Sequence, residues 1–477
     1  MSFSPIFPRP LLDRVLGRAD LLLFSLSAIL TIDTLASGAS TGVSIFFWWT
    51  ALIVFFFAPY GLIMAELGAA WPAEGGVYVW VREAFGPRWG SLAAWFYWIN
   101  NACWIPSVYL IFAGTFDSIF VGSGNVWFQA AVATVLTWLT VWLGIVRLQV
   151  SKWIPNLGAV VKVLIFLSLG VLGGLWIFSG RPAANELSLQ AMLPRWSDSL
   201  AFLPVLVYNT LGFELMSSAG EEMRDPQRDI PHVILLSGLI VAVVYTLGIL
   251  GILLAVPLGE LSIVTGTWDA LKILGGRWGG AGSALVYALG LGFLYACVSN
   301  VVTWSLGVNR VAAEAAIEGS LPRGLGRLHP RFHTPQVAFV VMGILATLLL
   351  VGNAILASSA SNVFWMIFKL SGLCFLISYL LAFPAFLVLR YRQPERNRPY
   401  RLPGGALAAW AASAICFLVI LAACILFFKP SPSSQAPVQE AWLLGAEALA
   451  TLVAGLLLMP RRKSRPSSGG SDGTPRA

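Results

Sequence analysis

The sequence predicts an all-α membrane protein with 12 transmembrane helices, arranged as a five-plus-five inverted repeat followed by two extra helices. Hydrophobic residues make up 58% of the 477 residues and charged residues only 11%, whereas globular proteins carry about 25% charged residues. Twelve apolar segments reach the length of about 20 residues that a helix needs to cross a bilayer. The first and sixth segments are each interrupted by polar residues, as expected at corresponding positions of an inverted repeat.

The predicted spans are separated by polar or charged segments. Their approximate boundaries are 20–43, 45–70, 88–120, 126–146, 153–178, 199–219, 232–256, 279–311, 335–353, 360–390, 406–428 and 439–460. The chain then divides into an N-terminal arm, two five-helix repeats, two further helices and a tail that is basic and then rich in Ser and Gly. Such a tail is expected to be disordered. The corresponding ranges are 1–19, 20–178, 199–390, 406–460 and 461–477.

The distribution of basic residues predicts the orientation. If the N-terminal arm is cytoplasmic, 23 of the 30 Lys and Arg residues fall in cytoplasmic segments, five fall on the opposite side, and Lys162 and Lys369 lie within spans. Cytoplasmic segments of membrane proteins carry such an excess of Lys and Arg. We therefore expect a multi-pass protein of the cell membrane with both termini in the cytoplasm. The formal charge of +8 is explained in this way, and nucleic acid is not an expected partner.

Loop lengths favour the five-plus-five arrangement. The basic loop between spans six and seven is short, which argues against a six-plus-six layout with a long central loop. The external segment 257–278 contains TGTWDALKIL, which predicts a short interfacial or lid helix.

Both interrupted spans contain a carboxylate. In span one, LLLFSLSAILTIDTLASGASTGVSIFF, the polar centre includes Asp33, and span six is broken between Tyr208 and Glu214. A carboxylate inside the bilayer is costly unless it faces protein or water, so intramembrane carboxylates are usually functional. Two such interruptions, one in the first helix of each predicted repeat, indicate a transporter.

Two segments carry a family resemblance. Residues 65–90, AELGAAWPAEGGVYVWVREAFGPRWG, match the E-(small)-P-x-x-G-G-x-Y-x-W-V pattern that follows the second helix in the amino acid–polyamine–organocation (APC) superfamily. Residues 212–231, GFELMSSAGEEMRDPQRDIP, resemble that superfamily's sixth helix and the loop after it. The resemblance covers about residues 20–390, and the pattern is most similar to the glutamate:GABA antiporter and amino acid–polyamine groups.

The resemblance implies a leucine-transporter-type fold and a secondary active transporter. Such a protein moves an amino acid or polyamine by alternating access, driven by protons or by exchange. Lys162 matches a lysine frequent in the family's fifth helix, where the ammonium takes the place of a sodium ion in sodium-coupled relatives. That match implies sodium-independent transport in which Lys162 either couples to protons or braces span one.

The two intramembrane carboxylates are the leading site candidates. Glu214 lies in the G-x-E motif and could take up a proton or bind a substrate amine, or it could stabilise backbone freed by the break. Asp33 could bind a substrate ammonium, or it could form a structural ion pair with Lys162 or Lys369. Family members often hold the substrate carboxylate on a G-S-G-like break in the first helix. Here SGA, at residues 37–39, could do so, or the break could begin at Asp33, where an acidic residue favours a substrate with an extra amine.

Backbone and aromatic groups complete the predicted substrate site. We expect free backbone amides and carbonyls at the breaks, because the N-terminus of a half-helix carries partial positive charge. Aromatic side chains could close over a substrate and make cation–π contacts, although any one of them could equally be a packing residue. The full predicted set is Asp33, Ser37, Gly38, Ala39, Trp104, Asn209, Gly212, Phe213, Glu214, Tyr295 and Trp365, with Lys162 and Glu214 as coupling residues.

Other classes of protein fit less well. Five Cys residues fall within apolar runs and three His residues lack metal-ligand spacing, so we expect no metal, no cofactor and no enzymatic activity. No G-x-x-x-x-G-K-[ST] motif is present, which argues against ATP-driven pumping within this chain. A channel would show a continuous polar stripe, whereas the polar residues cluster at one depth. A non-transporting amino acid sensor on the same fold stays an alternative. The expected partners are an amino acid or amine substrate, protons and the bilayer, and the oligomeric state is left open.

Overall fold

The computed structural model describes residues 17–72, 75–146, 153–194, 199–216, 225–356, 359–430 and 437–459. Within these ranges, 11 helical stretches are long and apolar enough to cross a membrane, and the sixth predicted span contributes a shorter apolar segment, Leu203–Met216. The described chain is helical, with no strand in it. This confirms the prediction of an all-α membrane protein. Residues 1–16 and the predicted tail, 461–477, lie outside the described residues, as do Glu221 and Arg224 of the loop after span six.

The continuous spans match the predicted boundaries closely. They are α6 (Pro87–Phe120), α7 (Val126–Ile145), α8 (Trp153–Phe178), α11 (Pro226–Ala255), α13 (Gly279–Ile317), α14 (Gln336–Leu356), α15 (Ala360–Arg392), α16 (Gly405–Leu426) and α17 (Pro437–Leu458). The second span joins α3 (Ile45–Leu52) to α4 (Ala58–Ala70) through a π-helical segment, Ile53–Phe57. Boundaries agree because hydrophobic length alone determines where a helix can cross the bilayer.

The first and sixth spans are broken, as predicted. Span one consists of α1 (Arg18–Ile29), a 3-10 turn (Ile32–Thr34) and α2 (Leu35–Ala39). Span six begins with α10 (Leu203–Tyr208), and a second helical turn covers residues 213–216. Between these two pieces Gly212 adopts a φ of +132°, a backbone conformation that favours glycine.

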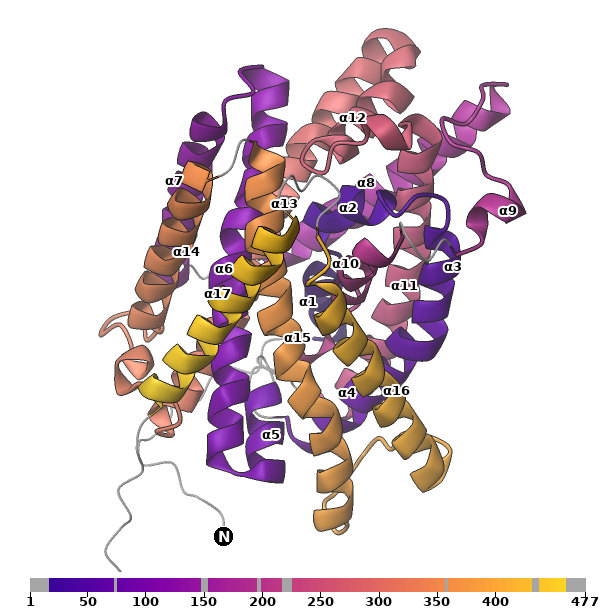
Figure 1. Cartoon of the computed structure of the whole chain (residues 1–477). Helices are drawn as coiled ribbons and strands as arrows, with labels where there is room; N and C mark the ends of the chain where they lie inside the picture. Colours follow the sequence, from indigo (N-terminus) through magenta and orange to yellow (C-terminus); the bar gives the residue numbers. More distant parts are fainter. Residues whose placement is uncertain are drawn as a thin grey trace, which may run out of the picture.

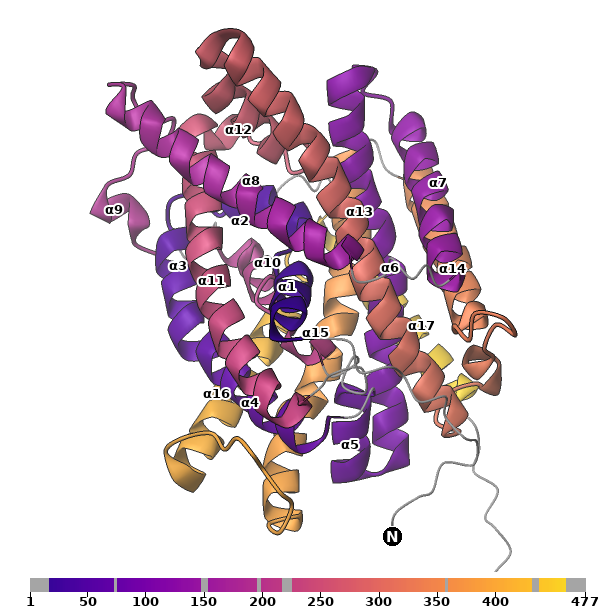
Figure 2. The same cartoon turned by 180° about the vertical axis from the view of Figure 1, so that it is seen from behind.

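The broken spans lie at the centre of the molecule. α1 packs against α8, α11 and α13, and α10 contacts α2, α15 and α16. Figure 1 shows α1 and α10 surrounded by the long helices, and Figure 2, the view from the opposite side, shows α8 crossing in front of them. α16 and α17 lie at the periphery, and most of α17 is exposed. This arrangement encloses both helix breaks in protein, which agrees with a leucine-transporter-type fold.

The connecting segments contain further short helices. α12 (Gly266–Gly275) confirms the short helix predicted in segment 257–278. α5 (Val77–Phe85) was not predicted as a separate helix. It is too short to span a bilayer, and it lies between Gly76 and Gly86, whose φ angles are +45° and +94°. The remaining short elements are α9 (Leu189–Met192) and the 3-10 turns Ser199–Ala201, Leu258–Glu260, Gly276–Trp278 and Arg323–Gly326.

Replacing Gly212 should destabilise the break in span six. A Cβ atom there would lie 3.2 Å from Ile29 and 3.3 Å from Trp304, and the positive φ adds strain of about 1–3 kcal/mol. We expect Gly212→Ala to lower the thermal denaturation midpoint of the purified protein. Gly174→Ala on α8 is the matched control, because a Cβ at Gly174 meets no atom within 4 Å. Equal midpoints for the two variants would contradict this prediction.

Candidate functional site

The break in span one frees backbone carbonyls that side chains from other helices then bind. In a continuous helix the Thr31 N–H would reach the Ser27 carbonyl, but it donates instead to Ile29 O (2.8 Å) and to the Tyr245 hydroxyl (3.0 Å). The Ser27 carbonyl accepts a hydrogen bond from Lys162 Nζ at 2.6 Å. Because buried backbone polar groups need partners, Lys162 takes over a backbone hydrogen bond that the break removes.

A second freed carbonyl, that of Ala28, is bound in the same way. It accepts a hydrogen bond from the indole Nε1 of Trp304 at 2.9 Å. Trp304 comes from α13 and is buried. The end of α1 is therefore capped by two side chains from two different helices.

The break in span six exposes backbone N–H groups in place of carbonyls. Gly212 N and Phe213 N both donate to the hydroxyl of Tyr60, at 3.0 and 3.1 Å. Tyr60 lies on α4 and is fully buried. Its hydroxyl also donates to Glu214 Oε2 at 2.7 Å, so one side chain supports both the backbone and the carboxylate of this break.

The two breaks are joined directly. Asn209 Oδ1, at the end of α10, accepts hydrogen bonds from Thr34 Oγ1 at 2.6 Å and Thr31 Oγ1 at 3.3 Å. The Tyr245 hydroxyl of α11 donates to the Thr31 carbonyl at 2.9 Å. Asn209 therefore connects the two broken spans through its side-chain oxygen.

Asp33 lies in the break of span one and is buried. Its carboxylate accepts hydrogen bonds from Trp104 Nε1 at 3.2 Å and from Asn300 Nδ2 at 3.3 Å. Both donors are neutral, and Asp33 forms no ion pair with any other described residue. Lys369, one of its two proposed partners, instead pairs with Glu440 of α17 and donates to the Lys429 carbonyl at 2.6 Å. Lys162, the other, forms no ion pair with Asp33 and shares Asn300 with it as a hydrogen-bond partner.

Glu214 lies in the break of span six and is also buried. Its two oxygens accept hydrogen bonds from the hydroxyls of Tyr60 at 2.7 Å and Tyr97 at 2.9 Å. The Tyr379 hydroxyl lies 3.3 Å from that of Tyr60. Like Asp33, this carboxylate has only neutral partners among the described residues.

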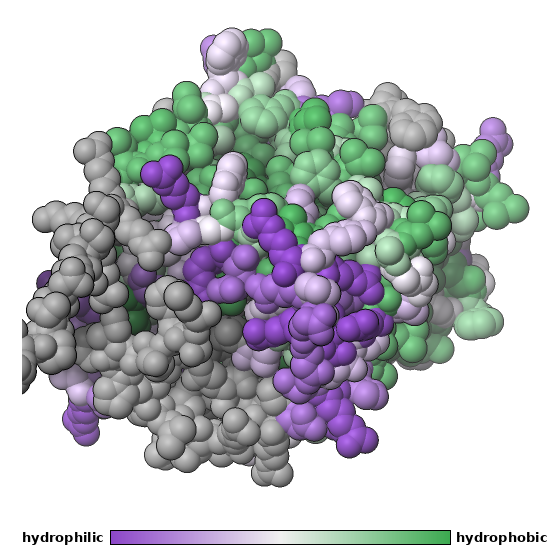
Figure 3. Space-filling model, turned by 90° about the horizontal axis from the view of Figure 1, so that it is seen from below, coloured by the Kyte–Doolittle hydropathy of each residue, from purple (hydrophilic) through white to green (hydrophobic). Residues whose placement is uncertain are grey.

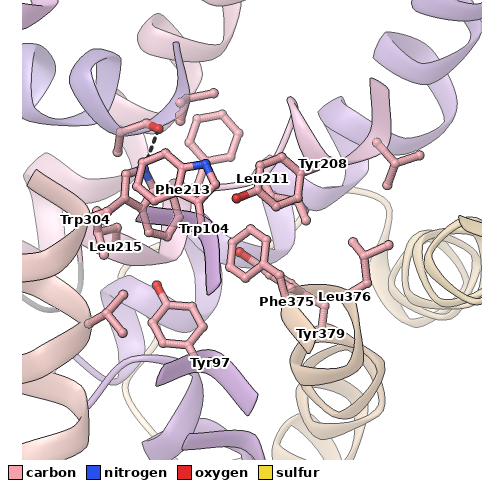
Figure 4. Packing of buried hydrophobic residues seen from close by; sticks show 14 of the residues in the cluster. Tyr97, Trp104, Tyr208, Leu211, Phe213, Leu215, Trp304, Phe375, Leu376 and Tyr379 are labelled. Carbon is pink, nitrogen blue, oxygen red and sulfur yellow. Dashed lines mark hydrogen bonds between the residues drawn. The ribbon is translucent and has the colours of Figure 1, made fainter. Parts of the chain in front are cut away.

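Aromatic rings surround the two carboxylates. Trp104, Trp304, Phe375 and Tyr97 form a continuous cluster, with centroid distances of 6.1 Å for Trp104–Trp304 and 5.4 Å for Trp304–Phe375. Figure 4 shows these rings gathered with Tyr379, which comes from the same helix as Phe375. Phe213 stacks on Phe57 of the second span at 5.1 Å. Trp104 and Phe213 are two of the four aromatic residues placed in the site from sequence. Trp104 donates to Asp33, and Phe213 packs against Tyr60, which binds Glu214.

Segment 37–39 differs from the expectation of open backbone. Ser37, Gly38 and Ala39 belong to the helical turn α2 and are buried, and the break lies earlier, after Ile29. The carbonyls of Gly38 and Ala39 are already bonded, to Thr41 N and Gly42 N. The expectation of free carbonyls there is wrong, because the chain resumes helical hydrogen bonding directly after the 3-10 turn. The assignment of these residues to the substrate site stays a prediction.

Two predicted site residues lie away from the cluster. The Tyr295 hydroxyl donates to the Ile154 carbonyl at 3.2 Å, and its side chain is partly exposed. Trp365 packs against Phe202 at 5.9 Å and against Phe368 at 6.1 Å. Trp365 is buried and is connected to Phe375 of the cluster through the rings of Phe368 and Tyr208. The assignment of Tyr295 and Trp365 to the substrate site stays a prediction.

Sequence reasoning missed several residues that the structure brings to the site. They are Tyr60, Tyr97, Tyr245, Asn300, Trp304, Phe375 and Tyr379. Asn300 could have been recognised from the sequence, because an amide side chain inside an apolar span needs polar partners. The aromatic residues could not have been recognised in this way, since the chain contains 60 Phe, Trp and Tyr residues.

The broken helices and this buried polar centre define a membrane transporter, and comparisons with known proteins agree. A family model described as amino acid permease matches residues 16–452. A probable agmatine/putrescine antiporter of Lactococcus lactis is 33% identical over 464 residues, which cover 95% of this chain and 98% of the relative. An uncharacterized transporter of Legionella pneumophila is 31% identical over 93% of this chain and 95% of its own length. The chain belongs to the amino acid permease family of the APC superfamily.

More distant similarities point the same way. A probable polyamine transporter of Arabidopsis thaliana is 26% identical over 353 residues, covering 73% of this chain and 66% of that protein. Among solved structures, a manganese transporter of Eremococcus coleocola superposes with a TM-score of 0.55 at 10% identity, over 94% of this chain and 96% of that one. At that identity the likeness concerns the fold alone.

The dual role of Tyr60 predicts a difference between two conservative variants. Tyr60→Phe leaves the Gly212 and Phe213 N–H groups without an acceptor, at about 1–3 kcal/mol for each buried donor. Tyr97→Phe removes one hydrogen bond to Glu214 and no backbone partner. We expect Tyr60→Phe to lower the thermal midpoint in detergent clearly more than Tyr97→Phe. Similar midpoints would show that the Tyr60 hydroxyl does not support the break.

Proposed function

We propose that the protein is a secondary transporter that carries a cationic amine, of the amino acid or polyamine class, across the cell membrane by alternating access. The observation that carries this proposal is the pair of buried carboxylates, Asp33 and Glu214, one at each helix break. Each is bound by neutral donors only among the described residues. A buried carboxylate without a cation is costly, so a substrate with positive charge would complete the site.

The chemistry of the surroundings supports an amine. The rings of Tyr97, Trp104 and Phe213 lie beside the carboxylates, and aromatic faces attract ammonium groups. A substrate with two amines could place one near each carboxylate. The names of two relatives, an agmatine/putrescine antiporter and a polyamine transporter, agree with such a substrate and suggest exchange.

Lys162 supports a mechanism without sodium. Its ammonium lies against the Ser27 carbonyl at the end of α1 and against Asn300 Oδ1. A fixed positive charge there would disfavour a sodium ion between α1 and α8. Transport would then be driven by protons or by the exchange of one amine for another.

Ion pairs between distant segments of the chain support alternating access. Arg18 Nε lies 2.5 Å from Asp229 Oδ1, Arg82 pairs with Glu318, and Glu66 Oε1 lies 3.4 Å from Arg398 Nε. All three join elements at the end of the molecule that basic residues predict to be cytoplasmic. Figure 3 looks onto this end and shows hydrophilic side chains gathered on part of it. These contacts would hold the cytoplasmic side closed until the helices move.

Neutral substitutions of the carboxylates should abolish most transport. Asp33→Asn and Glu214→Gln preserve size but remove the charge that a substrate amine would meet. Losing one charged hydrogen bond costs about 1.5–3 kcal/mol, or roughly 10–100-fold in affinity. We expect counterflow of labelled putrescine and of labelled arginine into proteoliposomes to fall roughly 10–100-fold. Glu447→Gln on α17 is the control and should transport normally.

Two results would contradict this assignment. One is wild-type counterflow in both carboxylate variants. The other is the absence of counterflow by the wild-type protein with a wider panel of amines and amino acids, which would favour a sensor.

Replacing external sodium with choline should leave the wild-type rate of counterflow unchanged.

The proposed orientation can be tested by cysteine labelling. The five native cysteines are buried, so an impermeant maleimide should find little background. Glu395 lies in the basic loop after α15 and Glu186 in the segment after α8, and both are exposed. In intact cells we expect labelling of Glu186→Cys but not of Glu395→Cys, with both labelled after lysis. The reverse pattern would place the basic side outside.

A further inference from the structure

The loop between α15 and α16 concentrates positive charge at the end of the molecule that basic residues predict to be cytoplasmic. Residues 390–401 contain five arginines and one acidic residue, Glu395. A second carboxylate reaches the loop from α4, where the buried Glu66 Oε1 lies 3.4 Å from Arg398 Nε and 3.5 Å from Arg390 Nε. Within this loop and its ion pairs, five guanidinium groups therefore share two carboxylates.

Three of these arginines hold the loop against neighbouring helices. Arg396 donates from Nε and Nη2 to the Ala70 carbonyl, at 3.1 and 3.0 Å, at the end of α4. Arg392 donates to the Ala84 carbonyl in the last turn of α5 at 2.9 Å. Arg398 is buried and donates to a carbonyl of α15. Positive charge at the C-terminal end of a helix is favourable, so these three guanidinium groups are already used within the protein.

Arg401 differs from the other four arginines. It is exposed, and its guanidinium forms no hydrogen bond or ion pair with any residue in the described part of the chain. Burial lowers the pKa of Arg398, and the charges of Arg401, Arg390 and Arg396 lower it further, although Glu66 raises it. The guanidinium groups therefore repel one another across the loop. An anion from outside the chain would relieve this repulsion, and Arg401 is free to bind one.

An exposed aromatic pair lies beside the loop. Trp410, in the second turn of α16, donates from Nε1 to the hydroxyl of Tyr391 in the last turn of α15 at 2.8 Å. Both side chains are more than half exposed, and Leu407 is 82% exposed. Arg390 Nη1 lies 3.4 Å from the Gly405 carbonyl and so joins this pair to the loop. Tyr and Trp are enriched where a membrane protein passes from hydrocarbon to lipid headgroups, so this pair marks that boundary.

The pictures agree with this placement. Figures 1 and 2 show the ends of α15 and α16, joined by their loop, at the lower end of the molecule. The two helices pack against each other. Figure 3 looks onto the same end and shows hydrophilic surface bordered by hydrophobic surface. Positive charge and lipid-facing apolar surface therefore meet at this end of the protein.

We propose that the α15–α16 rim, which consists of Arg390, Tyr391, Arg401, Leu407 and Trp410, binds an anionic phospholipid. Its phosphate binds at Arg401, and its acyl chains lie along Leu407 and Trp410. Guanidinium groups match phosphate oxygens in geometry and charge, and anionic lipids of the cytoplasmic leaflet attract basic segments next to the membrane. A soluble anion would use the charge but not the apolar surface. This partner is distinct from the amine substrate and does not depend on it.

The bound lipid should stabilise the folded protein. The loop that carries Arg401 is fixed to the ends of α4 and α5, because Leu402 N donates to Glu66 Oε2 at 2.8 Å and Arg392 and Arg396 bind helix carbonyls. A lipid that binds the rim only when these elements are assembled favours the native state and raises the denaturation midpoint.

The test measures the thermal midpoint of the purified full-length protein in detergent while phosphatidylglycerol is added. We expect phosphatidylglycerol to raise the midpoint more than phosphatidylcholine, whose phosphate charge is balanced by its own ammonium group. In Arg401→Gln, the concentration of phosphatidylglycerol that gives half of the shift should rise roughly fivefold, because one arginine near an anionic surface contributes about that factor. Arg401→Lys keeps the charge and should retain most of the effect.

Arg181→Gln is the matched control. Arg181 is also exposed and lies beside an aromatic ring, 4.6 Å from the centroid of Trp176, but it follows α8 on the side predicted to be external. This variant should respond to phosphatidylglycerol as the wild type does. Because Arg401 contacts no other described residue, Arg401→Gln should also have the wild-type midpoint before lipid is added, which shows that it folds.

Three results would overturn the proposal. The first is equal stabilisation by phosphatidylglycerol and phosphatidylcholine. The second is the same shift with inorganic phosphate at the same concentration, which would show that a free anion binds in place of a lipid. The third is a response of Arg401→Gln equal to that of the wild type, or an equal loss of response in Arg181→Gln.

Discussion

The structure depends on one constraint, which is that a helix broken inside an apolar bundle must find partners for the backbone groups it frees. In lipid no water is available for this purpose. Here the partners are side chains from other helices. Lys162 and Trp304 bind the carbonyls of Ser27 and Ala28 at the end of α1, while Tyr60 binds two N–H groups after Gly212. Each break therefore depends on side chains that the surrounding helices supply.

The same side chains build the proposed substrate site. Tyr60 donates to Glu214 while it accepts from the backbone, and Asn300 contacts both Lys162 and Asp33. Structural support and substrate chemistry cannot be separated at these positions. A rearrangement of the broken helices during transport would change the surroundings of both carboxylates at once, which is a physical basis for coupling substrate binding to movement.

Much of the fold could be predicted from the sequence. Each continuous span was located because a bilayer demands about 20 apolar residues, and both breaks were located because Asp33 and Glu214 are polar interruptions in such spans. The site was predicted less completely. Tyr295 and Trp365 were placed in it from their positions along α13 and α15, and they bond to Ile154 and pack on Phe202 respectively, so their assignment stays a prediction. Tyr97 and Trp304 were missed, because in a chain this rich in aromatic residues nothing in the sequence distinguishes a lining ring from a packing ring.

By itself, the sequence determined the number and order of the spans, the location of the breaks and the three central charges, since hydrophobic length and the cost of buried charge act on local segments. Only the tertiary structure decided which groups pair. Because α17 packs on α15, Lys369 forms its ion pair with Glu440. Asp33 instead accepts hydrogen bonds from Asn300 and Trp104. Pairing depends on which faces of distant helices meet, and no local pattern in the chain specifies that.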